Sequence, residues 1–159
     1  MRLSLTTILA GVAALPAVFA KPEQIRAVQA PIFHYYLQAY PQDPTIPVMG
    51  PEASSEYYTI GGAIQSANSS AYLNIGNDTT SYKTLSFGAA ETTDAWALEG
   101  DTIITGTGSS YGRQLNFLVC QLSGSGGTGY WQVFLQTGSE TPAGKTCSNF
   151  QSLHLPCIC

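Results

Sequence analysis

The stretch RQLNFLVCQLSGSGGTGYWQVFLQT, residues 113–137, holds the pattern that decides the predicted fold. Two short runs rich in apolar and aromatic residues, 113–122 and 130–137, flank a segment made mainly of glycine and serine. Runs of this length are typical of β-strands, and glycine between them allows the positive φ angles that a tight chain reversal needs. The stretch therefore predicts a β-hairpin with its tip at residues 123–130.

Short runs of the same kind occur along most of the chain, and turn-forming residues separate them. No segment repeats apolar residues at helical spacing over three turns. Short strands at regular spacing are typical of an antiparallel sandwich or barrel. We therefore predict an all-β, single-domain antiparallel β-sandwich or barrel, with a β-trefoil as the alternative. The runs lie at 56–62, 70–76, 82–88, 95–105, 113–122, 130–137 and 149–155, and segments 75–82 and 105–112 are predicted to be further hairpin tips.

The first twenty residues have the features of a secretory signal peptide. Arg2 precedes an apolar run from Ile8 to Phe19, and Val18 and Ala20 are the small residues that signal peptidase recognises. The apolar run is shorter than the roughly 18 residues that a membrane helix needs. We therefore predict a signal peptide at 1–20, a secreted protein that is extracellular or cell-wall associated, and no membrane partner.

Residues 21–31, the segment after the leader, show no firm period. We predict that they form an extended lead-in or a short propeptide, and that residues 32–159 form the single all-β domain. This domain opens with a predicted strand at 31–40, whose alternation places Phe33 on one face and His34 on the other.

Prolines dominate the next segment, residues 41–51. Proline has no backbone N–H to donate to a helix or to a central strand of a sheet. The segment is therefore predicted to be a polyproline-like loop on the surface. Its prolines are Pro41, Pro44, Pro47 and Pro51.

The charge balance excludes some partners. The chain has six Lys and Arg residues against ten Asp and Glu residues, a net charge of −4, and the basic residues do not cluster. A nucleic-acid-binding protein needs a basic surface to neutralise phosphates, so nucleic acid is not an expected partner. Only 10% of the residues are charged, and a polar surface with so little charge suits an extracellular β-protein. Asn68 and Asn77 begin N-x-[ST] motifs and are predicted glycosylation sites.

Two sets of side chains are candidates for catalysis. His34 and His154, if their strands are neighbours, could act as base and acid on a phosphodiester, with Arg113 stabilising the charge, as in a ribonuclease. Strand histidines are more often structural, and an acidic chain is a poor match to RNA.

The second set consists of Glu91, Asp94 and Glu99, which lie near Trp96 in the densest acidic part of the chain. A glycoside hydrolase uses two carboxylates across the sugar bond, and a tryptophan can stack on the sugar. Acidic residues at turns are usually only solvated, so we expect no enzyme as the first hypothesis. Neither an H-E-x-x-H nor a C-x-x-C motif occurs, and no metal or cofactor is predicted.

The four cysteines allow three pairings in the oxidising secretory pathway. A bond between Cys157 and Cys159 would close a very small, strained loop and would constrain little of the unfolded chain. We therefore expect at least one of these two to reach back to Cys120 or Cys147, which would hold the C-terminal strand on the sheet.

The order of the motifs also resembles a known family, the PhiA-type fungal cell-wall proteins, which include relatives described as IgE-binding. The similar region spans about residues 28–155. The resemblance implies a non-enzymatic, wall-associated protein, and it implies a Cys120–Cys147 disulfide, which conflicts with the long-range pairing that we rank first. The motifs are PIFHYYLQAY, a hairpin of YYTIGG and AYLNIG, TLSFG, WALEGD, NFLVC, YWQVFLQT and CSNFQSLHL.

We therefore predict a secreted, non-enzymatic structural or interaction protein of a fungal cell wall or surface. The expected partner is cell-wall polysaccharide or a host surface component. The alternatives are a carbohydrate-binding module and a secreted ribonuclease or glycoside hydrolase.

Overall fold

The computed structural model describes residues 20–123 and 129–156, which form one antiparallel β-sheet and a single turn of 3-10 helix, η1 (Glu52–Ser54). The all-β prediction is confirmed. The strands are β1 (Arg26–Ala27), β2 (Tyr36–Tyr40), β3 (Asp43–Gly50), β4 (Tyr58–Ile60), β5 (Ile64–Ser66), β6 (Tyr72–Ile75), β7 (Tyr82–Gly88), β8 (Trp96–Glu99), β9 (Thr102–Thr105), β10 (Phe117–Gln121), β11 (Trp131–Gln136), β12 (Cys147–Gln151) and β13 (Leu153–His154).

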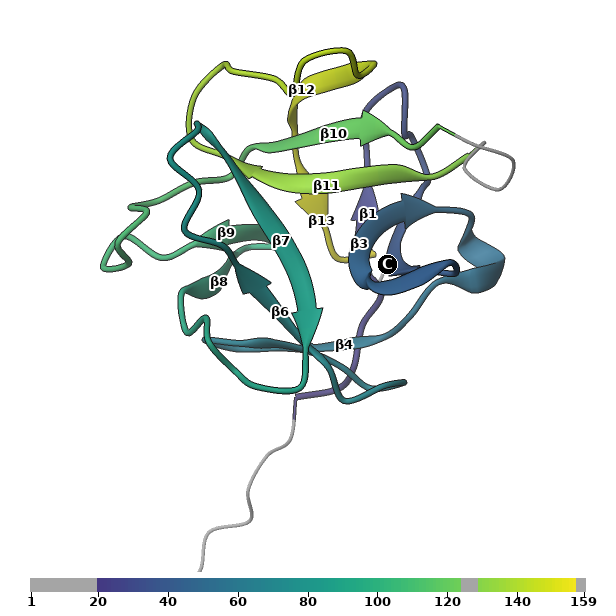
Figure 1. Ribbon diagram of the computed structural model, residues 1–159. Coiled ribbons are helices and arrows are strands. Elements are labelled where there is room, and N and C mark those ends of the chain that lie inside the picture. Colours follow the sequence, from purple (N-terminus) through teal and green to yellow (C-terminus); the bar gives the residue numbers. More distant parts are fainter. Residues whose placement is uncertain (1–19, 124–128, 157–159) are drawn as a thin grey trace, which may run out of the picture.

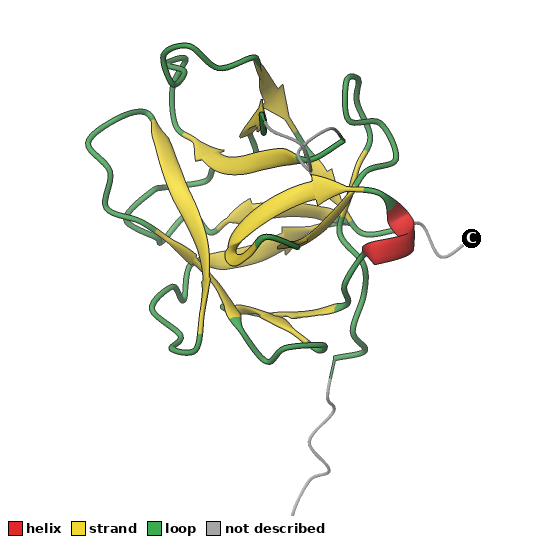
Figure 2. Ribbon diagram, turned by 45° about the vertical axis from the view of Figure 1, so that its right-hand side comes forward, coloured by secondary structure: helices red, strands yellow, loops and turns green. Residues whose placement is uncertain are grey.

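The sheet curls into a nearly closed, barrel-like shape (Figures 1 and 2). Its hydrogen-bonded path runs β4-β5-β6-β7-β11-β3-β2-β1-β13-β9-β8, and β10 joins β11 to β12 beside this path. The two ends of the path meet where the backbone N–H of Trp96 donates to the carbonyl of Gly62, at 2.9 Å. This order contains no threefold repeat, so the structure supports the barrel and not the β-trefoil alternative.

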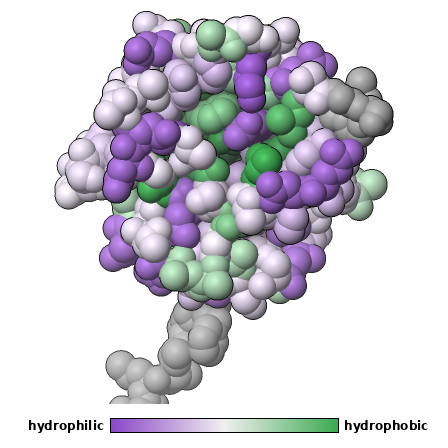
Figure 3. All heavy atoms as spheres, in the orientation of Figure 1, coloured by the Kyte–Doolittle hydropathy of each residue, from purple (hydrophilic) through white to green (hydrophobic). Residues whose placement is uncertain are grey.

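The core lies on the inner face of the curled sheet, because inward positions along the strands are apolar. In β7, for example, Leu85 and Phe87 are buried while Ser86 between them is exposed. Complete burial of each such side chain contributes about 1.5–3 kcal/mol. On the face of the molecule in Figure 3, hydrophobic residues show near the centre and hydrophilic residues surround them. The large apolar side chains that remain exposed are Phe33, Tyr57, Leu98 and Phe150.

The predicted hairpin at 113–137 is confirmed by the pairing of β10 with β11, from Phe117↔Leu135 to Gln121↔Trp131. Residues 124–128 at its tip lie outside the described residues. Both faces of β10 are buried, because β10 contributes to the main core and also packs Leu118 against Phe134 on the opposite side.

One disulfide, between Cys120 and Cys147, joins β10 to β12. The two cysteines are direct cross-strand partners, and their Cα atoms are 4.0 Å apart. The long-range pairing that we ranked first is therefore wrong, since Cys120 and Cys147 are bonded to each other. The C-terminal strand is held instead by its backbone pairing, and Cys157 and Cys159 lie outside the described residues.

The expected lead-in at 21–31 is part of the domain. Strand β1 lies in the middle of the sheet, between β2 and β13, and Ile25 and Ala27 are buried in the core. The predicted domain boundary at residue 32 is therefore wrong. A strand of two residues is too short to give a periodic signal, and its position is fixed by pairing partners far along the chain.

The strand predicted at 31–40 begins only at Tyr36. His34 has a φ of 60°, which is incompatible with a strand, and Phe33 beside it is exposed. Tyr36, Leu37 and Gln38 are all buried, so the alternation did not mark one inner and one outer face.

The predicted proline-rich loop at 41–51 is mostly the strand β3, which is a correction. On β2, the backbone N–H of Leu37 donates to Ile25 and that of Ala39 donates to the Glu56 side chain, so neither donates to β3. Pro47 lies opposite Ala39 and therefore occupies a position without a ladder hydrogen bond to β2. The pairing register shifts just beyond this point. Strand β11 pairs only with Val48 and Met49, after the prolines. Proline is tolerated at such irregular or one-sided positions.

The tip predicted at 75–82 is confirmed, because β6 and β7 on either side of it pair directly. The tip predicted at 105–112 is wrong, since β9 pairs with β8 and β13 whereas β10 pairs with β11 and β12. The expected hairpin of YYTIGG with AYLNIG is also corrected, because β5 lies between β4 and β6.

Candidate functional site

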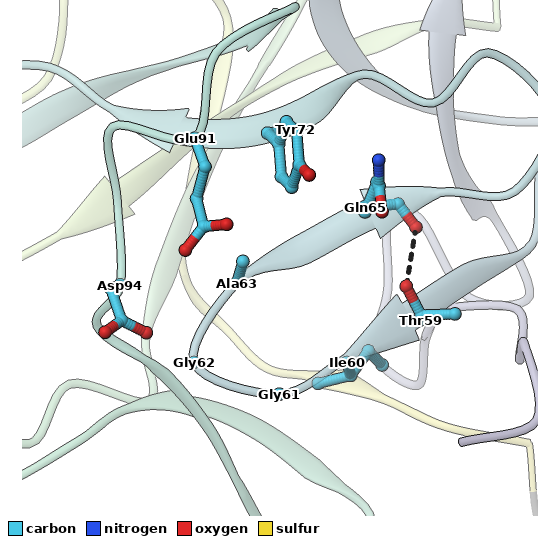
Figure 4. Close-up of a pocket in the computed structure, with 9 residues that line it drawn as sticks. All are labelled: Thr59, Ile60, Gly61, Gly62, Ala63, Gln65, Tyr72, Glu91 and Asp94. Carbon is cyan, nitrogen blue, oxygen red and sulfur yellow. Dashed lines mark hydrogen bonds between the residues drawn. The ribbon is translucent and has the colours of Figure 1, made fainter. Parts of the chain in front are cut away.

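A pocket of about 380 Å³ lies against the outer face of β4, β5 and β6 (Figure 4). Cross-strand pairing builds one wall of it. Thr59 pairs with Gln65, and Gln65 pairs with Tyr72, so the three side chains form a row on one face of the sheet. The remaining lining residues are Ile60, Gly61, Gly62, Ala63, Glu91 and Asp94.

The opposite wall carries two carboxylates, Glu91 and Asp94, on the segment between β7 and β8 (Figure 4). This segment is held in place by the side chain of Asn74 on β6. The Asn74 amide donates to the carbonyl of Ala90, at 2.8 Å, and its oxygen accepts from the backbone N–H groups of Thr92 and Thr93. The carboxylates are therefore presented by a loop that a largely buried polar side chain positions.

The turn between β4 and β5 forms the floor of the pocket. Gly62 lies so close to Asp94 that a Cβ built on Gly62 would be 1.8 Å from Asp94 Oδ1. A Cβ on the neighbouring Gly61 would have no other atom within 4 Å. Glycine at position 62 is thus what allows the Asp94 carboxylate to lie against the turn.

No ion pair involves Glu91 or Asp94 within residues 20–123 and 129–156. The pocket therefore carries negative charge that no Lys or Arg of the described chain compensates. With the Gln65 amide, the Thr59 hydroxyl and the Tyr72 ring, it offers hydrogen-bond acceptors, donors and one aromatic surface.

Glu99, the third predicted carboxylate, is separate from this pocket and is paired with Arg113. The Arg113 Nε donates to Glu99 Oε2 at 2.7 Å, and a second bond joins Arg113 Nη2 to Glu99 Oε1. The hydrogen bond from Arg113 lowers the pKa of Glu99 below its usual value, and Glu99 in turn raises the pKa of Arg113. The structure thus brings together two of the three predicted acids and uses the third in an exposed ion pair.

The two histidines do not form the pair that a ribonuclease would need. His154 lies on β13, His34 precedes β2, and β1 separates these two strands in the sheet. The His34 ring stacks on Phe33, with ring centroids 3.9 Å apart. His154 instead contacts Asp101 and Ser152, and Arg113 is occupied by Glu99.

Both predicted glycosylation sites are exposed, Asn68 and Asn77. Asn68 lies in the turn between β5 and β6 and accepts a hydrogen bond from the backbone N–H of Tyr57. Asn77 lies at the β6–β7 tip, so both sequons are accessible positions whose modification stays a prediction.

Sequence reasoning identified Glu91 and Asp94 but not Thr59 and Gln65, which lie opposite them. Their signal in the sequence is weak, because cross-strand neighbours are defined by the register and not by spacing along the chain. Among the described residues, no three metal-ligating side chains gather at one point. The described chain also contains no helix that is both apolar and long enough to cross a membrane.

Comparisons of this chain with protein-family models, with curated proteins and with solved structures find no match.

Proposed function

We propose that this is a secreted protein of a cell wall or cell surface whose pocket, between β4–β6 and the Glu91–Asp94 segment, binds polysaccharide without cleaving it. The observation that carries the proposal is the pocket itself. It combines two carboxylates that have no cationic partner among the described residues, an amide, a hydroxyl and a tyrosine ring.

These groups match the chemistry of a sugar. Sugar hydroxyls donate to carboxylates and to the amide oxygen, and charge-assisted hydrogen bonds of this kind are about twice as strong as neutral ones. An aromatic ring beside such acceptors can pack against the apolar face of a sugar ring. A pocket of about 380 Å³ lies at the small end of the usual range for ligand sites, about 300–1,000 Å³, which fits one or two sugar units.

The charge of the pocket narrows the class of saccharide. Uronic acids and sulfated sugars would place a negative charge beside the exposed carboxylates of Glu91 and Asp94, and like charges repel each other. Neutral sugars and sugars that carry a free amine fit better. We therefore expect binding to neutral or amino-sugar polymers and no binding to polyuronates.

The expected location rests on other features. The leader at 1–20 supports export, and the Cys120–Cys147 disulfide is of the kind that persists in an oxidising compartment. The motifs that resemble those of PhiA-type fungal cell-wall proteins support a wall-associated role.

The test is a titration of the purified protein with soluble oligomers of glucose, N-acetylglucosamine, glucosamine and galacturonate, followed by calorimetry. The variant Glu91→Gln/Asp94→Asn removes both charges with little change of shape. The matched control is Glu52→Gln, at an exposed acid on η1 that does not line the pocket. We expect binding of a neutral or amine-bearing oligomer that the control retains and the double variant loses by at least tenfold. Binding to none of these oligomers, or equal binding by the double variant, would contradict the proposal.

A further inference from the structure

A chain of three hydrogen-bonding side chains crosses the outer face of β13. His154 Nε2 lies 3.0 Å from Ser152 Oγ, and His154 Nδ1 lies 3.2 Å from Asp101 Oδ1. Ser152 and His154 are two residues apart and flank the buried Leu153, so their side chains share the face away from the core. Asp101 comes from the β8–β9 turn, which backbone pairing of His154 with Thr102 places beside β13.

The surroundings of the imidazole favour one tautomer. Two oxygen acceptors, Asp101 Oδ1 and Thr102 Oγ1, face Nδ1, at 3.2 and 3.3 Å. A proton on Nδ1 is stabilised by the carboxylate, which leaves Nε2 with a lone pair directed at the Ser152 hydroxyl. This order of serine, histidine and carboxylate is the geometry of an activated nucleophile, which is recognised by its distances and not by its position in the sequence.

A cationic group lies on the same face. Arg26 on β1 is the cross-strand partner of His154, so the two side chains are neighbours on the sheet surface. The Nε of Arg26 is buried and has no hydrogen-bond partner among the described residues. The Arg26 guanidinium therefore adds positive charge to the face of the sheet that carries His154.

Gln29 holds the serine in position from the other side. Its side-chain oxygen accepts from the backbone N–H of Ser152 at 3.0 Å, and the adjacent carbonyl of Ala30 accepts from Gln151. The Ser152 hydroxyl also lies 3.4 Å from the same Gln29 oxygen, and Ser152 is half-buried.

From this geometry we propose a second, catalytic site in which Ser152, His154 and Asp101 hydrolyse a small, uncharged carboxylic ester. Ser152 Oγ attacks the ester carbonyl carbon and gives its proton to His154 Nε2. The carbon–oxygen bond to the alcohol then breaks, and His154 returns the proton to the departing alkoxide. Water then attacks the acyl carbon and gives a proton to His154 Nε2. The bond between this carbon and Ser152 Oγ breaks, His154 returns the proton to Ser152, and the acid is released.

None of these residues lines the saccharide pocket, so this site is independent of the proposed binding function.

The chain also contains Gly108-Ser109-Ser110-Tyr111-Gly112, which matches the letters of a hydrolase nucleophile motif. The motif requires a turn from a strand into a helix. In this chain the segment connects two strands, so it lacks that context. Ser110 is exposed and, in the described chain, has no histidine or carboxylate as a side-chain hydrogen-bond partner, so it serves as a matched control.

The test combines a fluorophosphonate probe, which labels activated serines covalently, with hydrolysis of p-nitrophenyl acetate. Peptide mass mapping of the probed full-length protein identifies the labelled residue. We expect labelling of Ser152, loss of labelling and of hydrolysis in Ser152→Ala, and unchanged behaviour in Ser110→Ala. His154→Gln should lower the hydrolysis rate by on the order of a hundredfold or more, whereas His34→Gln should not.

Near-ultraviolet circular dichroism of each variant shows whether it is folded. The proposal is overturned if folded wild-type protein takes up no probe, if Ser152→Ala is labelled as strongly as wild type, or if His154→Gln and His34→Gln hydrolyse the ester equally.

Discussion

The carboxylate of Asp94 lies directly against the backbone of Gly62, where a Cβ on Gly62 would be 1.8 Å from Asp94 Oδ1. This contact joins the β4–β5 turn to the segment that carries both pocket acids. A second link, the hydrogen bond from the backbone N–H of Trp96 to the Gly62 carbonyl, holds the same turn.

Gly62→Ala should therefore impair binding more than folding. The new methyl group displaces the flexible end of Asp94 and no backbone atom, so we expect a change in the free energy of unfolding within about 1 kcal/mol. The displaced carboxylate should weaken oligosaccharide binding several-fold by calorimetry. Gly61→Ala, with open space around its Cβ, is the control and should bind as wild type does. Equal binding by both variants would show that the position of Asp94 is unimportant.

Loss of the Cys120–Cys147 disulfide should lower stability substantially. The cysteines are 27 residues apart, and closing a loop of that length in the unfolded chain is worth about 3–4 kcal/mol at 25 °C. The double variant Cys120→Ala/Cys147→Ala should lose a similar amount in urea unfolding. Mass mapping of unreduced peptides should recover Cys120 linked to Cys147, and a peptide that links Cys120 to Cys157 or Cys159 would refute this pairing.

Trp96→Phe should destabilise the barrel where its two ends meet. The indole Nε1 of Trp96 donates to the carbonyl of Leu73 at 2.9 Å, and the ring is buried and stacked with Phe117. Loss of this hydrogen bond and of ring volume should cost about 2–4 kcal/mol. Trp131→Phe, at a half-buried ring, should cost clearly less. Urea unfolding followed by far-ultraviolet circular dichroism tests this, because that signal does not depend on tryptophan fluorescence.

Acid should weaken the ion pairs around the β8–β9 turn. Hydrogen bonds from His154 and from Arg113 lower the pKa values of Asp101 and Glu99 in the folded protein. A carboxyl group with a lower pKa when folded stabilises the protein above its unfolded pKa, about 4, and this stabilisation is lost as pH falls through the folded pKa.

The measurement is the free energy of unfolding of wild type and of Asp101→Asn/Glu99→Gln between pH 6 and pH 2.5. The wild type should lose its advantage over the double variant as pH falls below about 4. Both groups are exposed, so the advantage should be small and should shrink in high salt. A difference that is constant with pH would contradict the assignment.

The sequence was most informative where local chemistry and the final fold agree. The runs around β10 and β11 and the turn between β6 and β7 carry their own strand and turn signals, and both were predicted correctly. The acids Glu91 and Asp94 were predicted as candidates together with Glu99, because all three are close along the chain. Arg113 and Glu99 could not be paired in advance, since Arg113 is fourteen positions after Glu99 and strand β9 lies between them.

By itself, the sequence determined the class of the fold, because short apolar runs between glycine and asparagine turns can bury their side chains only as an antiparallel sheet. Only the tertiary structure decided which strands are neighbours. It gave β1 two partners from distant parts of the chain, admitted Pro47 where β2 makes no hydrogen bond, and joined Cys120 to Cys147 across two paired strands. It also placed Ser152 and His154 beside Asp101. The physical reason is that register and long-range pairing depend on contacts between segments far apart in the chain, for which local residue patterns carry no signal.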